Sequence, residues 1–120
     1  MSFCVILLAA GNSKRFSHKI PKPFIKVAGR SILELSLLKF KNIKQIKNII
    51  IVINKKHQKF IKSIKSKKFA KIIGGKTRQE STLKALKYIR RNRIKCSKVL
   101  IHDSARPNFS LQLIKRILSK

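Results

Sequence analysis

The chain has 120 residues, enough for one small domain with its own core, and its 43% of hydrophobic residues exclude a disordered tail. Lysine and arginine total 31 against 3 acidic residues, a formal net charge of +28, but these cations are spread along the whole chain rather than gathered in one arm. The two cysteines, Cys4 and Cys96, lack metal-ligand spacing and favour a reducing cytoplasm, and the apolar run at residues 3–10 is too short to span a membrane.

Apolar periodicity and turn residues predict four strands, each followed by a helix. In chain order, the predicted elements are a strand at 3–9, a loop at 10–23, an extended piece at 24–27, a helix opened by Ser31, a strand at 48–53, a helix at 55–66, a strand at 70–73, a helix at 78–91, a strand at 98–101, a loop at 102–108 and a helix at 111–118. This alternation indicates an α/β fold with a parallel sheet and helices on its faces. No strand follows the last predicted helix, so we expect the sheet to be incomplete at the C-terminus.

Three of the predicted strands end in segments that differ from the lysine-rich background. These segments are AAGNSKRF after the first strand, GGKTRQES after the third and HDSARP after the fourth. In an open parallel sheet, ligands bind beyond the carboxyl ends of the strands. We therefore expect the three segments to meet at one edge of the sheet and to share one ligand.

The three acidic residues divide into two kinds. Glu34 and Glu80 each stand three residues after a serine or threonine at a predicted helix start, which is the pattern of a capping box. Asp103 follows a buried strand and has no such helix start nearby. It is either a ligand for a divalent cation or a structural residue, in an Asx-type turn or paired with Arg106.

Small residues favour close approach of backbone to a ligand at two places. Ala9, Ala10 and Gly11 precede a basic loop whose N–H groups could bind an anion, although a solvated basic loop explains the same residues. Gly74 and Gly75 either end a strand or bring backbone groups up to a base or sugar. Just after them, near the positive end of a predicted helix, lie Arg78 and Ser81.

Taken together, the three segments resemble the Rossmann-like nucleotidyltransferases, and most closely the 2-C-methyl-D-erythritol 4-phosphate cytidylyltransferase family. The resemblance rests on LLAAGNSKRF followed by PKPFIKVAGRSILE, then GGKTRQESTLKAL, then VLIHDSARP, in the order and spacing that the family shows. It covers essentially the whole chain and implies a Rossmann-like, mostly parallel sheet with helices on both faces. Residues 1–120 would then be the N-terminal portion of a single nucleotidyltransferase domain.

The resemblance also implies a reaction and roles for individual residues. The reaction is transfer of CMP from CTP to 2-C-methyl-D-erythritol 4-phosphate with release of pyrophosphate, in the non-mevalonate route to isoprenoid precursors, with Mg²⁺ as cofactor. Arg15 and Lys22 would stabilise the transition state, and Asp103 would bind the metal. The nucleotide and sugar phosphate would be bound by Ala9, Ala10, Gly11, Gly75, Arg78, Ser81, Ser104 and Arg106.

Some features depart from the family pattern. Ser13 stands where a second glycine is common, Pro23 replaces a glutamine, and Ser104 replaces the first alanine of HDAARP. Family members are also considerably longer, and their later half supplies a further metal-linked aspartate and the arm of a homodimer. We therefore expect this chain to be part of a longer protein that forms a homodimer. Some members of the family are also fused to the cyclodiphosphate synthase of the same pathway.

Three alternatives stay open from the sequence. Another sugar-phosphate or polyol-phosphate nucleotidyltransferase, such as a ribitol-phosphate cytidylyltransferase, would share the first loop and the HD-x-x-RP pattern. A basic nucleic-acid-binding module would use the lysines, although no nucleic-acid motif accompanies them and we do not expect nucleic acid as the partner. An inactive fragment with a partial sheet would expose apolar surface.

Overall fold

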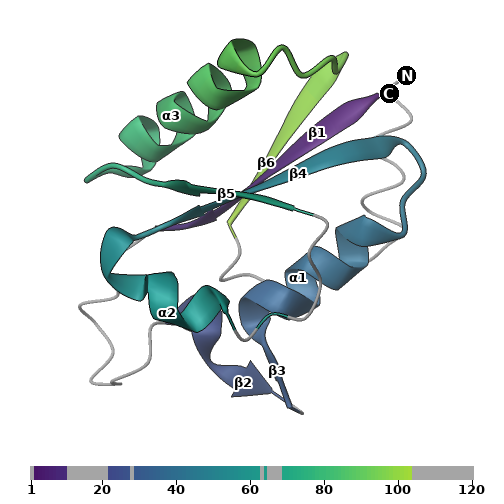
Figure 1. The fold of residues 1–120 in the computed structure, drawn as a ribbon. Helices are drawn as coiled ribbons and strands as arrows, with labels where there is room; N and C mark the ends of the chain where they lie inside the picture. The colour runs from purple at the N-terminus through teal and green to yellow at the C-terminus, as the bar shows by residue number, and fades with distance from the viewer. Residues whose placement is uncertain (1, 11–21, 28, 63, 65–68, 104–120) are drawn as a thin grey trace.

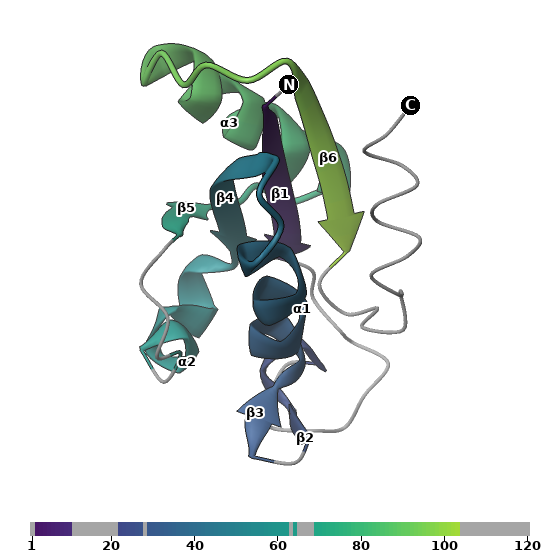
Figure 2. The ribbon, with the colours of Figure 1, turned by 90° about the vertical axis from the view of Figure 1, so that its right-hand side faces the viewer.

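The computed structural model describes residues 2–10, 22–27, 29–62, 64 and 69–103. Within this part of the chain the main sheet has four strands in the order β5-β4-β1-β6, and every neighbouring pair is parallel. Its strands are β1 (Phe3–Ala9), β4 (Ile46–Ile53), β5 (Ala70–Ile73) and β6 (Lys98–Asp103). Figure 2 shows that the arrows of β1, β4 and β6 all point the same way. The predicted parallel sheet is confirmed.

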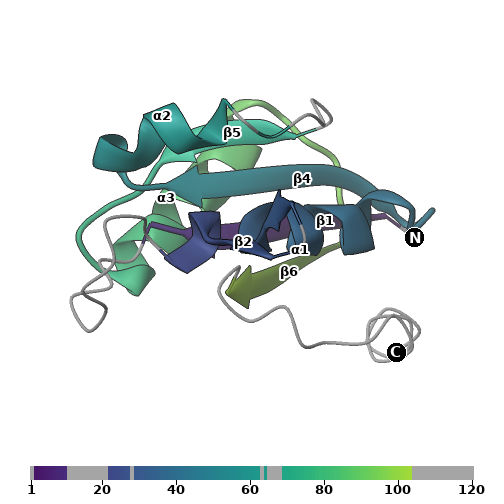
Figure 3. The same cartoon turned by 90° about the horizontal axis from the view of Figure 1, so that it is seen from below.

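Helices cover both faces of this sheet, which confirms the Rossmann-like α/β arrangement. Helix α3 (Arg78–Arg91) lies on one face, and α1 (Ile32–Lys41) and α2 (Gln58–Ile61) lie on the other (Figure 1). Seen from below, α1 lies over β1 and α2 lies on the side of β5 (Figure 3). Among the described residues, no helix has the length and apolar composition that crossing a membrane requires.

The described part of the core consists of two clusters, one on each face of the sheet, because successive side chains of β1 point to opposite faces. Val5 and Leu7 pack with Leu37 and Phe40 of α1, whereas Ile6 packs with residues of α3 on the opposite face. All seven residues of β1 are buried, which explains why its sequence is a continuous apolar run rather than an alternating one. β1 is therefore an inner strand of the sheet that contributes to the core under both helical layers.

The sheet leaves apolar side chains exposed at β6. Val99 and Ile101 lie beside Cys4 and Ile6 in register, and each is 36% exposed. On α3, Leu83 is 51% exposed and Leu86 is 40% exposed. The exposed side chains of Val99 and Ile101 on β6 fit the predicted incompleteness of the sheet at its C-terminus.

The two capped helices begin where the sequence predicts. Ser31 caps α1 by accepting a hydrogen bond from the Glu34 N–H at 3.1 Å. Thr77 caps α3 in the same way, with the Glu80 N–H as donor at 3.0 Å. Helix α3 has the predicted bounds of 78–91. In both cases a hydroxyl satisfies a backbone donor that the first turn leaves without a partner.

Other boundaries differ from the prediction. The expected helix at 55–66 is shorter: a 3-10 turn, η2 (Lys55–His57), leads into α2, which ends at Ile61. Its first turn holds no acidic residue, so the lysines of this segment have no opposite charges one turn away to support a longer helix. Strand β4 starts two residues before the predicted 48, and β6 continues through Asp103 rather than ending at 101. Asp103 is thus the last residue of a strand and not part of a loop.

The segment expected to be extended at 24–27 contains two short elements. A 3-10 turn, η1 (Lys22–Phe24), comes first, followed by β2 (Lys26–Val27). β2 pairs in antiparallel fashion with β3 (Arg30–Ser31), and Gly29 adopts a φ of 85° in the turn between them. Glycine tolerates that left-handed conformation without a steric penalty. The predicted helix at 111–118 lies outside the described residues.

The two cysteines are free thiols in contrasting environments. Cys4 is fully buried in β1, whereas Cys96 is partly exposed. Burial raises the pKa of the Cys4 thiol to about 12, and a hydrogen bond with the Cys96 side chain adds to the rise. Cys4 therefore stays protonated at neutral pH in the folded protein.

We predict that iodoacetamide at pH 8 labels Cys96 in the folded protein and leaves Cys4 unmodified, because only a thiolate reacts and the buried thiol is neutral. Mass spectrometry of the labelled peptides measures this, and protein unfolded in urea, in which both thiols react, is the control. Equal labelling of both cysteines in the folded protein would contradict the buried position of Cys4.

Candidate functional site

The ends of three strands meet at a small pocket, as the sequence predicts. The pocket has a volume of about 120 Å³ and lies at the carboxyl edge of the sheet. Its lining residues come from the end of β1, from the segment that joins β5 to α3, and from the end of β6: Leu8, Ala10, Gly75, Lys76, Thr77, Arg78, Ser81 and Asp103. Thus all three of the distinctive sequence segments contribute to it.

A larger pocket of about 540 Å³ adjoins the first and shares Ala10, Gly75 and Lys76 with it. Its remaining walls come from the end of β4 and from the same β5–α3 segment: Asn54, Lys55, Lys56, Ile73, Gly74, Glu80 and Lys84. Four of its residues are lysines, so the pocket is strongly electropositive. The loop formed by residues 74–77, hereafter the glycine loop, borders both pockets.

Three successive N–H groups of the glycine loop donate hydrogen bonds within the protein. Gly74 donates to the carbonyl oxygen of Ile53 at 2.8 Å, and Gly75 donates to the hydroxyl oxygen of Ser81 at 3.1 Å. Lys76 donates to Oε2 of Glu80 at 2.8 Å. Because these three N–H groups are already used, the main-chain groups that Gly75 and Lys76 can offer to a ligand are their carbonyl oxygens.

Both glycines of this loop are required by close packing. A Cβ at Gly74 would lie 2.6 Å from Oγ of Ser81, 2.7 Å from Cβ of Ala10 and 2.9 Å from Cγ1 of Val52. A Cβ at Gly75 would lie 2.5 Å from Cβ of Glu80. These distances are shorter than van der Waals contact. Only glycine at positions 74 and 75 therefore lets the loop pack this closely against Ala10, Val52 of β4 and the first turn of α3.

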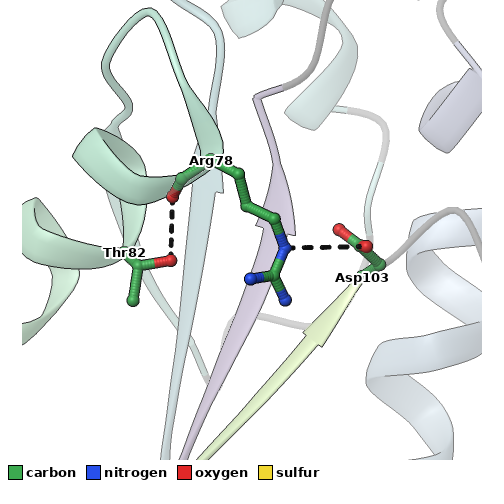
Figure 4. Close-up of polar contacts among 3 residues, drawn as sticks. All are labelled: Arg78, Thr82 and Asp103. Atoms are coloured by element: carbon green, nitrogen blue, oxygen red, sulfur yellow. Dashed lines mark hydrogen bonds and ion pairs between the residues drawn. The ribbon is translucent and has the colours of Figure 1, made fainter.

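An ion pair joins the start of α3 to the end of β6. Nε of Arg78 lies 3.8 Å from Oδ2 of Asp103, and Figure 4 shows the arginine side chain reaching across to the carboxylate. The Arg78 side chain is 61% exposed and that of Asp103 is 40% exposed, so the pair is solvated and weak. The carbonyl oxygen of Arg78 in turn accepts a hydrogen bond from the Thr82 hydroxyl at 2.9 Å. Asp103 is therefore accessible to a competing cation.

The predicted site residues fall into four groups. Ala10, Gly75, Arg78, Ser81 and Asp103 all line the smaller pocket. Ala9 is 2% exposed and its side chain packs in the core, so only its backbone is placed to meet a ligand. Lys22 begins η1, and the remaining predicted residues lie outside the described part of the chain: Gly11, Arg15, Ser104 and Arg106.

Sequence reasoning missed several residues that line the pockets. Lys76 and Thr77 lie within the GGKTRQES segment, so the motif could have identified them as pocket-lining residues. Asn54 follows β4 directly, and the rule that ligands bind beyond strand ends would have selected it. Lys84 contributes from one turn further along α3 and donates to the carbonyl oxygen of Gly74 at 3.5 Å. No local pattern distinguishes this lysine from the many others.

Comparisons with known proteins agree with this geometry. The family model described as 2-C-methyl-D-erythritol 4-phosphate cytidylyltransferase matches residues 3–120. The bifunctional enzyme IspD/IspF of Pelagibacter ubique is 45% identical over 120 residues, covering 100% of this chain and 32% of that protein. The 2-C-methyl-D-erythritol 4-phosphate cytidylyltransferase of Wigglesworthia glossinidia brevipalpis is 44% identical over 105 residues, covering 86% of this chain and 44% of that protein.

A solved structure gives the same result for the fold. The bifunctional IspDF of Campylobacter jejuni superimposes with a TM-score of 0.82 at 28% identity, covering 99% of this chain and 30% of that one. The chain thus spans less than half the length of each of these three relatives.

We predict that Gly74→Ala destabilises the protein by about 1–3 kcal/mol, the usual cost of forcing an extra group into a packed site. The new methyl group would collide with Ser81, Ala10 and Val52 at once. Urea denaturation measures the loss, and Lys71→Ala, at an exposed position of β5, is the control with an expected change below about 0.5 kcal/mol. A Gly74→Ala variant as stable as the control would contradict the described packing of the loop.

Proposed function

Because the chain belongs to the 2-C-methyl-D-erythritol 4-phosphate cytidylyltransferase family, as its match over residues 3–120 shows, we propose that the protein containing it transfers CMP from CTP to 2-C-methyl-D-erythritol 4-phosphate. Pyrophosphate is the second product, and the reaction serves isoprenoid precursor biosynthesis. We further propose a homodimer, on the strength of the family resemblance, and action in the cytoplasm, which the two free thiols support.

The observation that carries this proposal is the glycine loop between the two pockets. Its N–H groups at Gly74, Gly75 and Lys76 are used within the protein, which leaves carbonyl oxygens as hydrogen-bond acceptors. The exocyclic amino group of cytosine is a donor, whereas uracil carries an acceptor at the same position. A loop that offers acceptors therefore supports recognition of cytosine over uracil.

The phosphate groups of CTP also find suitable partners at this edge. The N-terminus of α3 faces the smaller pocket, and the positive end of a helix favours anions. Arg78 adds a guanidinium group, and the larger pocket is bordered by Lys55, Lys56 and Lys76. These charges support a polyphosphate ligand more specifically than the net charge of the chain does.

Asp103 fits the role of a magnesium ligand. Its carboxylate lines the smaller pocket, is partly exposed, and offers the hard oxygen atoms that Mg²⁺ prefers. Among the described residues, no group of three His, Cys, Asp or Glu side chains gathers around it, which suits a cation that takes its other ligands from phosphates and water. When bound there, magnesium would polarise phosphoryl oxygens and fix their geometry.

The proposed chemistry needs positioning and charge rather than a protein nucleophile. An oxygen of the sugar phosphate attacks the α-phosphorus of CTP, its new P–O bond forms as the bond to the leaving pyrophosphate breaks, and negative charge grows on the phosphoryl oxygens. Arg15 and Lys22, which the family resemblance assigns, would stabilise that charge in the transition state.

The direct test is pyrophosphate release from CTP, 2-C-methyl-D-erythritol 4-phosphate and Mg²⁺ by the full-length protein. We expect turnover with this sugar phosphate and with CTP in preference to UTP. Turnover with ribitol 5-phosphate instead would favour the polyol-phosphate alternative and overturn the proposed substrate. Salt-dependent RNA binding without CTP binding would overturn the proposed function as a whole.

We predict that Arg15→Ala and Lys22→Ala each lower turnover of the full-length protein on the order of 10²–10³-fold, as loss of one transition-state charge contact does elsewhere. The KM for CTP should change much less than kcat. Lys26→Ala removes a cation from an exposed position of β2 and should leave turnover close to that of the wild type. Normal turnover by Arg15→Ala would contradict its assigned role.

We predict that Asp103→Asn lowers magnesium-dependent turnover by on the order of 10²-fold, because metal polarisation of phosphoryl oxygens contributes several kcal/mol. Stability should change by less than about 1 kcal/mol, since the ion pair with Arg78 is exposed. Glu34→Gln removes one negative charge that lines neither pocket and serves as the control. If Asp103→Asn responded to magnesium as the wild type does, Asp103 would not be the metal ligand.

A further inference from the structure

We propose that Glu80 is a positioning residue of the nucleotide site, which holds the glycine loop in the shape that receives the base. This inference rests on the proposed function and adds to it a residue that does not touch the reacting atoms. Three observations support it: an unusual capping contact of Glu80, its steric match to Gly75, and the position of the contacted residues Gly75 and Lys76 at the border of both pockets.

The first observation concerns where the Glu80 carboxylate points. In a capping box, the glutamate three residues into the helix accepts a hydrogen bond from the N–H of the capping residue itself. Here that residue is Thr77, yet Oε2 of Glu80 accepts from the N–H of Lys76 at 2.8 Å, one residue earlier in the chain. The carboxylate thus reaches past the helix start and fixes the glycine loop.

The second observation is that Gly75 and Glu80 are sterically matched. A Cβ at position 75 would lie 2.5 Å from Cβ of Glu80 and 2.6 Å from its Oε2. The carboxylate therefore occupies the space that any other residue at position 75 would need for its side chain. The adjacent N–H of Gly75 donates to Oγ of Ser81, so two consecutive peptide groups are held by two consecutive residues of α3.

The third observation is the location of this contact. Gly75 and Lys76 border both pockets, and Glu80 itself lines the larger one. With its N–H directed to Glu80, the peptide between Gly75 and Lys76 has its carbonyl oxygen on the opposite side, because the two groups of a trans peptide point in opposite directions. Glu80 therefore determines which way that acceptor faces.

The chain offers a matched control in Glu34. It occupies the corresponding position of α1, where its N–H donates to the Ser31 cap at 3.1 Å. Glu34 lines neither of the two pockets. Removing its carboxylate tests what loss of a helix-start charge does by itself, whereas removing that of Glu80 also releases the Lys76 N–H.

The experiment compares Glu80→Ala, Glu80→Gln and Glu34→Ala in the full-length protein. We expect Glu80→Ala to raise the KM for CTP about tenfold, the effect of one hydrogen bond to a charged group, with little change in the KM for the sugar phosphate. Glu80→Gln should recover most of this loss, because its amide oxygen can still accept from Lys76. Glu34→Ala should lower the Tm less than Glu80→Ala, because it breaks no hydrogen bond to a loop, and should leave the KM for CTP unchanged.

Amide hydrogen exchange provides a readout that does not depend on activity. The Lys76 amide should exchange faster in Glu80→Ala than in the wild type or in Glu80→Gln. An unchanged KM for CTP in Glu80→Ala, or a Glu80→Gln variant as impaired as Glu80→Ala, would overturn this proposal while wild-type turnover stands. A wild-type protein that binds no CTP would instead overturn the proposed function.

Discussion

The parallel pairing of β1 with β4 and β6 is the constraint on which the site depends. Ala9 pairs with Ile53, Leu8 pairs with Asp103, and Ile53 in turn pairs with Ile73. The four strands therefore end in nearly the same row, and the residues that follow them emerge side by side. Burial of every β1 residue fixes this register, because a shift by one residue would exchange its two apolar faces between the helical layers.

The first turn of α3 fixes the shape of the glycine loop at this edge of the sheet. Thr77 caps the helix, Ser81 receives the N–H of Gly75, and Glu80 receives the N–H of Lys76. The same few residues thus begin a helix and hold a loop, so the loop needs no side chains of its own for support. These hydrogen bonds from α3 explain how the loop keeps one conformation although positions 74 and 75 are glycines.

Sequence reasoning predicted the parts of this structure that follow from local patterns. The bounds of α3, the two helix caps and the meeting of strand ends at one edge follow from periodicity, hydroxyl residues and the rule for parallel sheets. The apolar periodicity at 55–66 overestimated α2, because it ignores that no acidic residue supports the lysines of this segment, and the extension of β6 to Asp103 depends on pairing with the distant strand β1. The hydrogen bond between the Lys76 N–H and Glu80 could not be predicted either, since the capping-box pattern predicts that Glu80 accepts from the N–H of Thr77. Arg15 and Arg106 keep their roles as predictions.

We propose above all that the carboxyl edge of the sheet binds a cytidine nucleotide. Amide NMR of the protein titrated with CTP and Mg²⁺ tests it most directly, because each residue reports separately. We expect chemical-shift changes to concentrate at Ala10, Gly75, Lys76, Ser81 and Asp103, and Cys4 and Lys98, at the opposite ends of their strands, not to respond. UTP should produce much weaker changes. Shifts spread evenly over the lysine-rich surface, or equal responses to CTP and UTP, would contradict a cytidine site at this edge.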